Sequence, residues 1–267
     1  MNEQNPVPPV IPKPGQSQSP PPPPPPPPQN PRAPGDDPAE REPIPHGIAA
    51  IEAVLRQPLR LLYQLRQPGA GWLIAQMVLI AVVCASVYGV VVGTFSGGTQ
   101  LWAAPVKIAA GMMISASICL PSLYIFTCLS GSKAHLAEVC GLLAGLLMLM
   151  TILLVGFAPV AWIFSQSTES LAWMGVLHIA FWFVAAFFGV RFLVHGFSHT
   201  EAKSSAGVNV WIIIFLLVAL QMTTALRPII GKADTFFPDK KEFFLQHWYD
   251  CLNEGSNPAP NPSNQVP

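Results

Sequence analysis

Five apolar stretches of at least 19 residues follow one another along the chain, and few of their residues carry a charge. A helix rises about 1.5 Å per residue, so roughly 20 such residues cross a hydrocarbon core of about 30 Å. The stretches cover residues 72–95, 101–129, 137–164, 171–193 and 208–226. We therefore predict an all-α fold, a polytopic transmembrane helix bundle of about five spans within residues 70–231. Pro121 is expected to kink the second span or to end it early.

The composition agrees with this class of protein. Hydrophobic residues make up 51% of the 267 residues, charged residues only 10%, and the mean hydropathy is +0.43. The 14 basic side chains match the 14 acidic ones in number. A chain without net charge has no global field that would attract nucleic acid, so we expect no nucleic-acid partner.

Residues 1–46 have a different composition, rich in proline and poor in apolar side chains. Residues 20–28 are consecutive prolines. Such a segment has little apolar surface to offset the entropy lost on folding, so we predict a disordered tail with a stiff polyproline II stretch. Polyproline II fits the aromatic-lined grooves of SH3, WW and profilin-type domains, which makes a cytosolic proline-binding protein an expected partner. The alternative is a spacer that binds nothing.

Residues 47–69 combine arginines with apolar residues at helical spacing. The apolar residues are Ile48, Ile51, Val54, Leu55, Leu59 and Leu62. Arg56, Arg60 and Arg66 fall largely on other faces of such a helix. This pattern predicts an amphipathic helix in the membrane interface, or alternatively a cytosolic helix that covers the bundle. Pro58 is expected to bend this helix or to split it in two.

The distribution of basic residues predicts the orientation of the bundle. Six of them precede the first span, Lys133 follows the second, and Arg191 and Lys203 lie around the loop after the fourth. The loops at 96–100 and 165–170 have none. Because basic residues concentrate on the cytosolic side, we expect a cytosolic N-terminus. The basic residues after the fifth span would then lie outside, against this rule, so the side of the C-terminus stays open.

Three basic residues fall in the outer half of the predicted bundle. Lys107 and His178 lie six and seven positions inside their spans, so both are roughly 10 Å below the outer boundary. Arg227 ends the fifth span. Cations in a membrane are unfavourable without a partner or water, so these three residues form a candidate site for an anion or a lipid headgroup. The alternative is structural: Lys107 reaches the interface, His178 bonds a helix carbonyl and Arg227 anchors its helix.

Two glycine patterns predict close packing of helices. Gly89, Gly93 and Gly97 repeat every four residues in the first span, and Gly141 and Gly145 do so in the third. Glycines at this spacing let two helix backbones approach closely. We expect them either to pack the bundle internally or to form a homo-oligomer interface.

Signals for catalysis or metal binding are weak. The five cysteines show no ligand spacing, and four of them lie in apolar spans. His195 and His199 are four residues apart, but no flanking carboxylate completes a zinc-protease pattern. The sequence contains no nucleophile elbow, phosphate loop or dinucleotide fingerprint. We therefore expect no metal, no cofactor and no enzymatic activity.

One stretch near the C-terminus resembles known proteins. The signature QMxxxLRPxxG is formed by Gln221, Met222, Leu226, Arg227, Pro228 and Gly231. It resembles the end of an uncharacterised group of bacterial multi-spanning membrane proteins, and the arrangement of spans is similar to the topology of Yip1-type membrane proteins. This resemblance implies a scaffold or trafficking-type protein in a bacterial inner membrane. Residues 232–267 are expected to form an amphipathic segment and a disordered tail.

Two functions fit these features. The first is a non-enzymatic integral membrane scaffold or organising protein whose proline-rich cytosolic arm binds partners. The second is a small transporter or lipid-handling protein that uses the outer cationic residues, with membrane lipids as partners. We favour the first because the spans hold few ionisable groups, none spaced as a proton relay, and show no inverted repeat.

Overall fold

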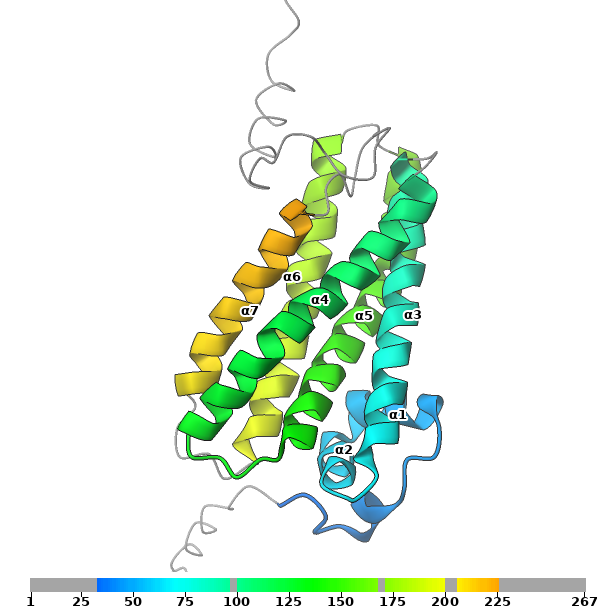
Figure 1. Cartoon of the computed structure of the whole chain (residues 1–267). Helices are drawn as coiled ribbons and strands as arrows, with labels where there is room; N and C mark the ends of the chain where they lie inside the picture. The colour runs from blue at the N-terminus through cyan, green and yellow to red at the C-terminus, as the bar shows by residue number, and fades with distance from the viewer. Residues whose placement is uncertain (1–32, 97–99, 168–170, 200–205, 226–267) are drawn as a thin grey trace, which may run out of the picture. The chain divides into compact units, whose positions relative to one another are not determined.

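The computed structural model describes residues 33–96, 100–167, 171–199 and 206–225. Regular structure in these ranges is entirely helical (Figure 1). The elements are η1 (Pro38–Arg41), α1 (Gly47–Arg56), α2 (Pro58–Leu65), α3 (Ala70–Ser96), α4 (Gln100–Leu129), α5 (Leu136–Ser167), α6 (Leu171–Ser198) and α7 (Ala206–Ala225).

Four of the described helices, α3 to α6, are long and apolar enough to cross a membrane. The length and composition of these helices confirm the prediction of an all-helical membrane protein. The fifth predicted span corresponds to α7, which has 20 residues and a shorter apolar stretch at Gly207–Leu220. Pro121 does not end the second span, because α4 continues through Pro105 and Pro121 to Leu129.

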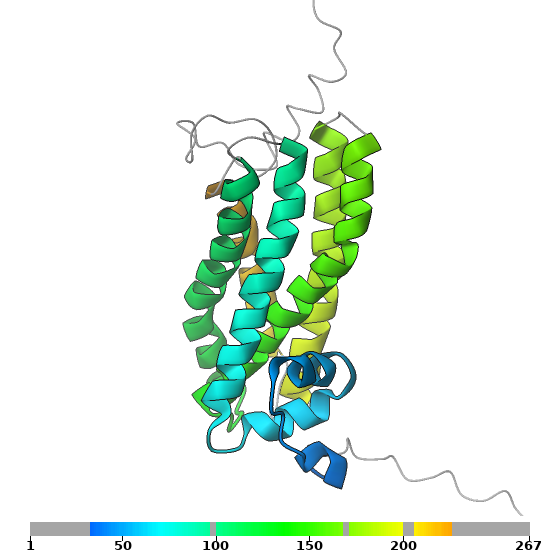
Figure 2. The same ribbon diagram turned by 90° about the vertical axis from the view of Figure 1, so that its right-hand side faces the viewer.

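Consecutive long helices run in opposite directions, and α1 and α2 lie where α3 begins and α6 ends (Figure 1). Figure 2 shows α1 and α2 at this same end after the molecule is turned. We call it the capped end and the opposite one the open end. Helix α5 packs against α3 and α6, while α4 packs against α3 and α7. We call α1 and α2 the cap. The cap packs on the bundle through contacts of α1 with α3 and of α2 with α5 and α6.

The capped-end half of α5 is the centre of the packing. Residues 141–150 are all buried, which leaves this stretch of α5 no face toward lipid. Glycine makes this possible, because a Cβ on Gly141 would overlap Leu65 of α2 and one on Gly145 would meet Phe192 of α6 at 2.7 Å. Both glycines of this pattern, Gly141 and Gly145, therefore face neighbours within the chain.

The first glycine pattern has a similar role where the structure describes it. A Cβ on Gly89 would overlap the backbone of Pro105, so α3 and α4 approach closely there. Gly93 is also buried. Gly97, the third member of the pattern, lies outside the described residues.

Exposed tryptophans lie near both ends of the long helices. Trp72 at the start of α3 is 71% exposed, and Trp102 at the start of α4 is 80% exposed. Trp162 near the end of α5 and Trp173 near the start of α6 are also more than half exposed. Tryptophan prefers the boundary between lipid and water because its ring is apolar and its N–H is polar. One such residue at the capped end and three at the open end agree with a bundle embedded in a bilayer.

Helix α7 is attached to α4 by a buried tryptophan. Trp211 is fully buried and its Nε1–H donates to the carbonyl of Cys119 at 2.9 Å. Its ring stacks on Phe215, with ring centroids 5.1 Å apart. Nearer the capped end, a Cβ on Gly207 would meet the Ser130 hydroxyl at 2.6 Å. The fifth predicted span therefore packs against the bundle through α4.

Residues 33–46, which we predicted to belong to the disordered tail, fold onto α2. Arg60 donates to the carbonyls of Glu42 and Pro43, both at 3.1 Å. Gln64 donates to the carbonyls of Arg41 and Glu42 at 3.2 and 3.1 Å. The predicted boundary at residue 46 is therefore wrong, because the folded unit begins at residue 33. Residues 1–32 lie outside the described part of the chain.

Residues 47–69 form two helices, split at Pro58 as the sequence predicts. Their buried residues face the bundle, and these are Ala50, Ala53 and Val54 on α1 and Leu61, Leu62 and Leu65 on α2. Ile48 and Leu55 stay 78% and 48% exposed. The two helices therefore cover the end of the bundle, and α1 keeps an apolar surface that a membrane interface could accommodate.

Candidate functional site

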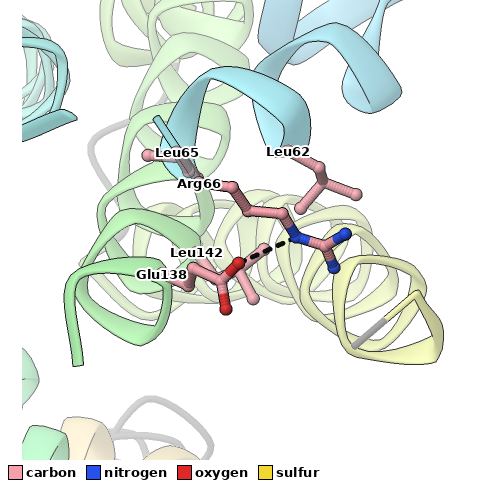
Figure 3. A pocket seen from close by; sticks show the side chains of 5 residues that line it. All are labelled: Leu62, Leu65, Arg66, Glu138 and Leu142. Carbon is pink, nitrogen blue, oxygen red and sulfur yellow. Dashed lines mark hydrogen bonds and ion pairs between the residues drawn. The ribbon is translucent and has the colours of Figure 1, made fainter. Parts of the chain in front are cut away.

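A polar group that joins three helix ends lies at the capped end and is centred on Arg66. Its Nε–H donates to Oε1 of Glu138 at 2.8 Å (Figure 3). Its Nη2 donates to the carbonyl of His199 at 2.8 Å. We call Arg66, Glu138 and His199 the capped-end junction. It joins the end of α2 to the start of α5 and to the residue that follows α6.

Helix ends explain why these residue types meet here. Glu138 is in the first turn of α5, where backbone N–H groups lack partners, and its Oε2 accepts the N–H of His135 at 3.2 Å. The His199 carbonyl follows the C-terminus of α6, where a cation is favourable. The side chains of Glu138 and Arg66 are 11% and 36% exposed. The ion pair is therefore partly shielded from water and stronger than one on an open surface.

The crevice at this junction is filled by its own side chains. Leu62, Leu65 and Leu142 line it together with Arg66 and Glu138 (Figure 3). It has no room for a water molecule. The junction is therefore a joint between helices rather than a pocket for a small ligand.

The His199 side chain lies close to other charged and titratable groups at the capped end. Burial, together with electrostatic repulsion from His195 and Arg66, lowers the pKa of His199, while Glu40 opposes the shift. The rings of His195 and His199 meet edge to face with centroids 4.9 Å apart. The lowered pKa favours the neutral form of the His199 ring beside the Arg66 guanidinium. Within the described residues, no three His, Cys, Asp or Glu side chains are placed to hold a metal ion.

In the open-end half, His178 forms a pair that the sequence analysis did not select. The Tyr88 hydroxyl of α3 lies 2.6 Å from Nδ1 of His178 on α6, and both residues are buried. The alternative that His178 bonds a helix carbonyl is therefore wrong. Nε2 of His178 is buried and has no hydrogen-bond partner among the described residues. The only signal for Tyr88 in the sequence was a polar aromatic residue within an apolar span.

Lys107 is buried in the bundle. It is 1% exposed, so its side chain does not reach the interface as the structural alternative supposed. Gly111 and Ser115, at four and eight positions further along α4, are buried as well, so this face of the helix is turned inward. The hydrogen bond of His178 goes to Tyr88 rather than to Lys107. Arg227, the third predicted member of the cationic site, lies outside the described residues.

Comparison of the chain with protein-family models, with curated proteins and with solved structures finds no match.

Proposed function

We propose that the protein is a non-enzymatic membrane scaffold that holds a proline-rich cytosolic arm at the surface of a bacterial inner membrane. The observation that carries the proposal is the attachment of the root of this arm. Arg60 and Gln64 bind the backbone at residues 41–43, and Arg66 binds α2 to the bundle. A segment that enters the folded unit at residue 33 is thus fixed to helices that cross the membrane.

This attachment has a physical consequence for partner binding. Nine prolines in polyproline II geometry extend about 28 Å, at about 3.1 Å per residue. Such a stretch is pre-extended, so a protein with an aromatic-lined groove loses little entropy in ordering it. A partner that binds the arm is held near the membrane at a raised effective concentration, which is what a scaffold provides.

The orientation follows from charge and packing. Six basic residues precede the first span, and we place that side in the cytosol by the positive-inside rule. The buried Trp211 packs α7 into the bundle, which supports five crossings and a C-terminus on the other side. The capped end then faces the cytosol together with the arm.

Two deletions test the attachment of the arm. Removing residues 1–32 is expected to abolish partner binding and to leave thermal unfolding in detergent unchanged. Removing residues 1–45 is expected to destabilise the cap by about 1–2 kcal/mol as well, because Arg60 and Gln64 lose their backbone acceptors. If both truncated proteins unfold at the same temperature, residues 33–45 do not hold the root of the arm.

One observation favours a second function, the handling of an anionic lipid or solute. His178 Nε2 is a buried polar atom without a described partner, in the same half of the bundle as the buried Lys107. Groups of this kind within a membrane commonly belong to binding sites. If Lys107, His178 and Arg227 bind one anion, the substitutions Lys107→Gln, His178→Gln and Arg227→Lys should each reduce the anionic lipid that co-purifies, as measured by native mass spectrometry. Unchanged lipid retention in all three variants would exclude this second function and leave the scaffold as the proposed function.

A further inference from the structure

Arg191 is an arginine on the outside of a membrane-spanning helix. It lies within the candidate span Trp173–Ser198 and its side chain is exposed. Ser198 follows it by seven positions, so it is roughly 10 Å along the helix from the capped end. None of the hydrogen bonds or ion pairs in the described part of the chain includes Arg191. Its positive charge is therefore not balanced by the protein where the chain is described.

The face of α6 that carries Arg191 changes character along its length. Toward the open end, Val184, Phe187 and Phe188 are 42%, 61% and 47% exposed. Toward the capped end, His195 follows Arg191 by four residues and is also exposed. Residues spaced by three, four and seven positions share one face of a helix. We call these five residues the α6 stripe, which is apolar toward the open end and carries Arg191 and His195 toward the capped end.

A lipid-facing arginine needs an anion at the depth that its side chain can reach. An arginine in the hydrocarbon core is costly, and a long side chain near a helix end reduces this cost by extending to the headgroup region. The groups available there are lipid phosphates, which match the planar fork of a guanidinium with two parallel hydrogen bonds. Acyl chains of the same lipid would lie against the exposed rings one turn above.

We propose that the α6 stripe binds an anionic phospholipid, whose phosphate contacts Arg191 and His195 and whose acyl chains lie on Phe187 and Phe188. Charge selects the lipid. Glu138 of the capped-end junction is already paired with Arg66, so it does not offset the charge of Arg191. A lipid with net negative charge supplies the missing counter-charge, whereas the ammonium group of a zwitterionic lipid would be repelled.

This proposal is independent of the proline-rich arm and of the second candidate function. The α6 stripe begins in the middle of α6 and ends near the capped end, whereas Lys107 and His178 lie in the open-end half. A lipid bound at the stripe would stabilise the end of α6 where His199 accepts a hydrogen bond from Arg66.

Native mass spectrometry of the full chain from nanodiscs containing equal amounts of phosphatidylglycerol and phosphatidylethanolamine tests this. The wild-type protein should retain phosphatidylglycerol selectively. Arg191→Gln should weaken that retention about tenfold, which is the loss expected for a charge-assisted contact to phosphate. Arg56→Gln is the matched control, because it removes an exposed arginine from α1, which does not pack against α6.

The outcomes separate this site from the second candidate function. If Arg191→Gln loses phosphatidylglycerol while His178→Gln and Lys107→Gln retain it normally, the lipid binds at the α6 stripe. Equal retention of the two lipids by the wild-type protein would overturn the proposal without any variant. So would unchanged retention in Arg191→Gln, or an equal loss in Arg56→Gln.

Discussion

Arg66→Ala is expected to release the cap from the bundle, with a loss of about 2–3 kcal/mol in the free energy of unfolding. The substitution leaves the mostly buried Glu138 carboxylate without its ion-pair partner and removes the hydrogen bond to the His199 carbonyl. Removing one partner of a fully buried pair costs about 3–5 kcal/mol, and the 36% exposure of the Arg66 side chain reduces this loss.

Hydrogen exchange in nanodiscs measures this release. The amides of α1 and α2 should exchange faster in Arg66→Ala, while those in the buried part of α5 stay protected. The exchange rates in Arg66→Lys should lie between those of the wild-type protein and of Arg66→Ala, because an ammonium keeps the charge but cannot replace the guanidinium fork. Arg56→Ala removes an exposed arginine from the same cap and should behave as wild type. Normal protection of α2 in Arg66→Ala would mean that the leucines alone hold the cap.

Trp211→Ala is expected to produce the second large loss, about 3 kcal/mol, and to detach α7 from α4. Trp211 is fully buried, so the change removes packing and leaves a cavity between the two helices. It also frees the Cys119 carbonyl from the indole N–H. Trp211→Phe should lose less, about 1 kcal/mol, because it keeps most of the packing and gives up the hydrogen bond.

Thermal unfolding in detergent measures these losses. Trp173→Ala is the control, since this tryptophan is 65% exposed and faces outward. A loss that is equal for Trp211→Ala and Trp173→Ala would contradict the packing of α7 against α4.

The long helices could be predicted from sequence because hydropathy and length alone define a span. The predicted spans at 72–95 and 101–129 correspond to α3 at Ala70–Ser96 and α4 at Gln100–Leu129. Pro58 split the cap as expected, because proline removes a backbone donor whatever surrounds it. These features depend on local chemistry, which a single sequence contains in full.

The contacts of individual polar residues could not be predicted. The direction in which each apolar helix faces depends on packing against its neighbours, so nothing in the sequence pointed from His178 to Tyr88. The sequence predicts only that Arg66 lies away from the apolar face of its helix, because its partner Glu138 is 72 residues further along the chain.

The end of the predicted tail was misplaced for a related reason. Low apolar content predicted disorder up to residue 46. Residues 33–46 are instead held largely by hydrogen bonds from α2 to their backbone carbonyls, which composition does not reveal. The attachment therefore depends on the side chains of Arg60 and Gln64 rather than on apolar burial.

Site-specific photo-cross-linking in intact cells tests the scaffold most directly. A photoreactive residue at Gln29, beside the prolines, should form discrete adducts with cytosolic proteins. The same residue at Ser167, at the open end of α5, should form none of them. Replacing residues 20–28 by alternating glycine and serine should abolish the Gln29 adducts while the protein still inserts. Absence of cytosolic adducts from Gln29, or adducts that persist without the prolines, would contradict the proposal that this protein is a membrane scaffold with a proline-rich binding arm.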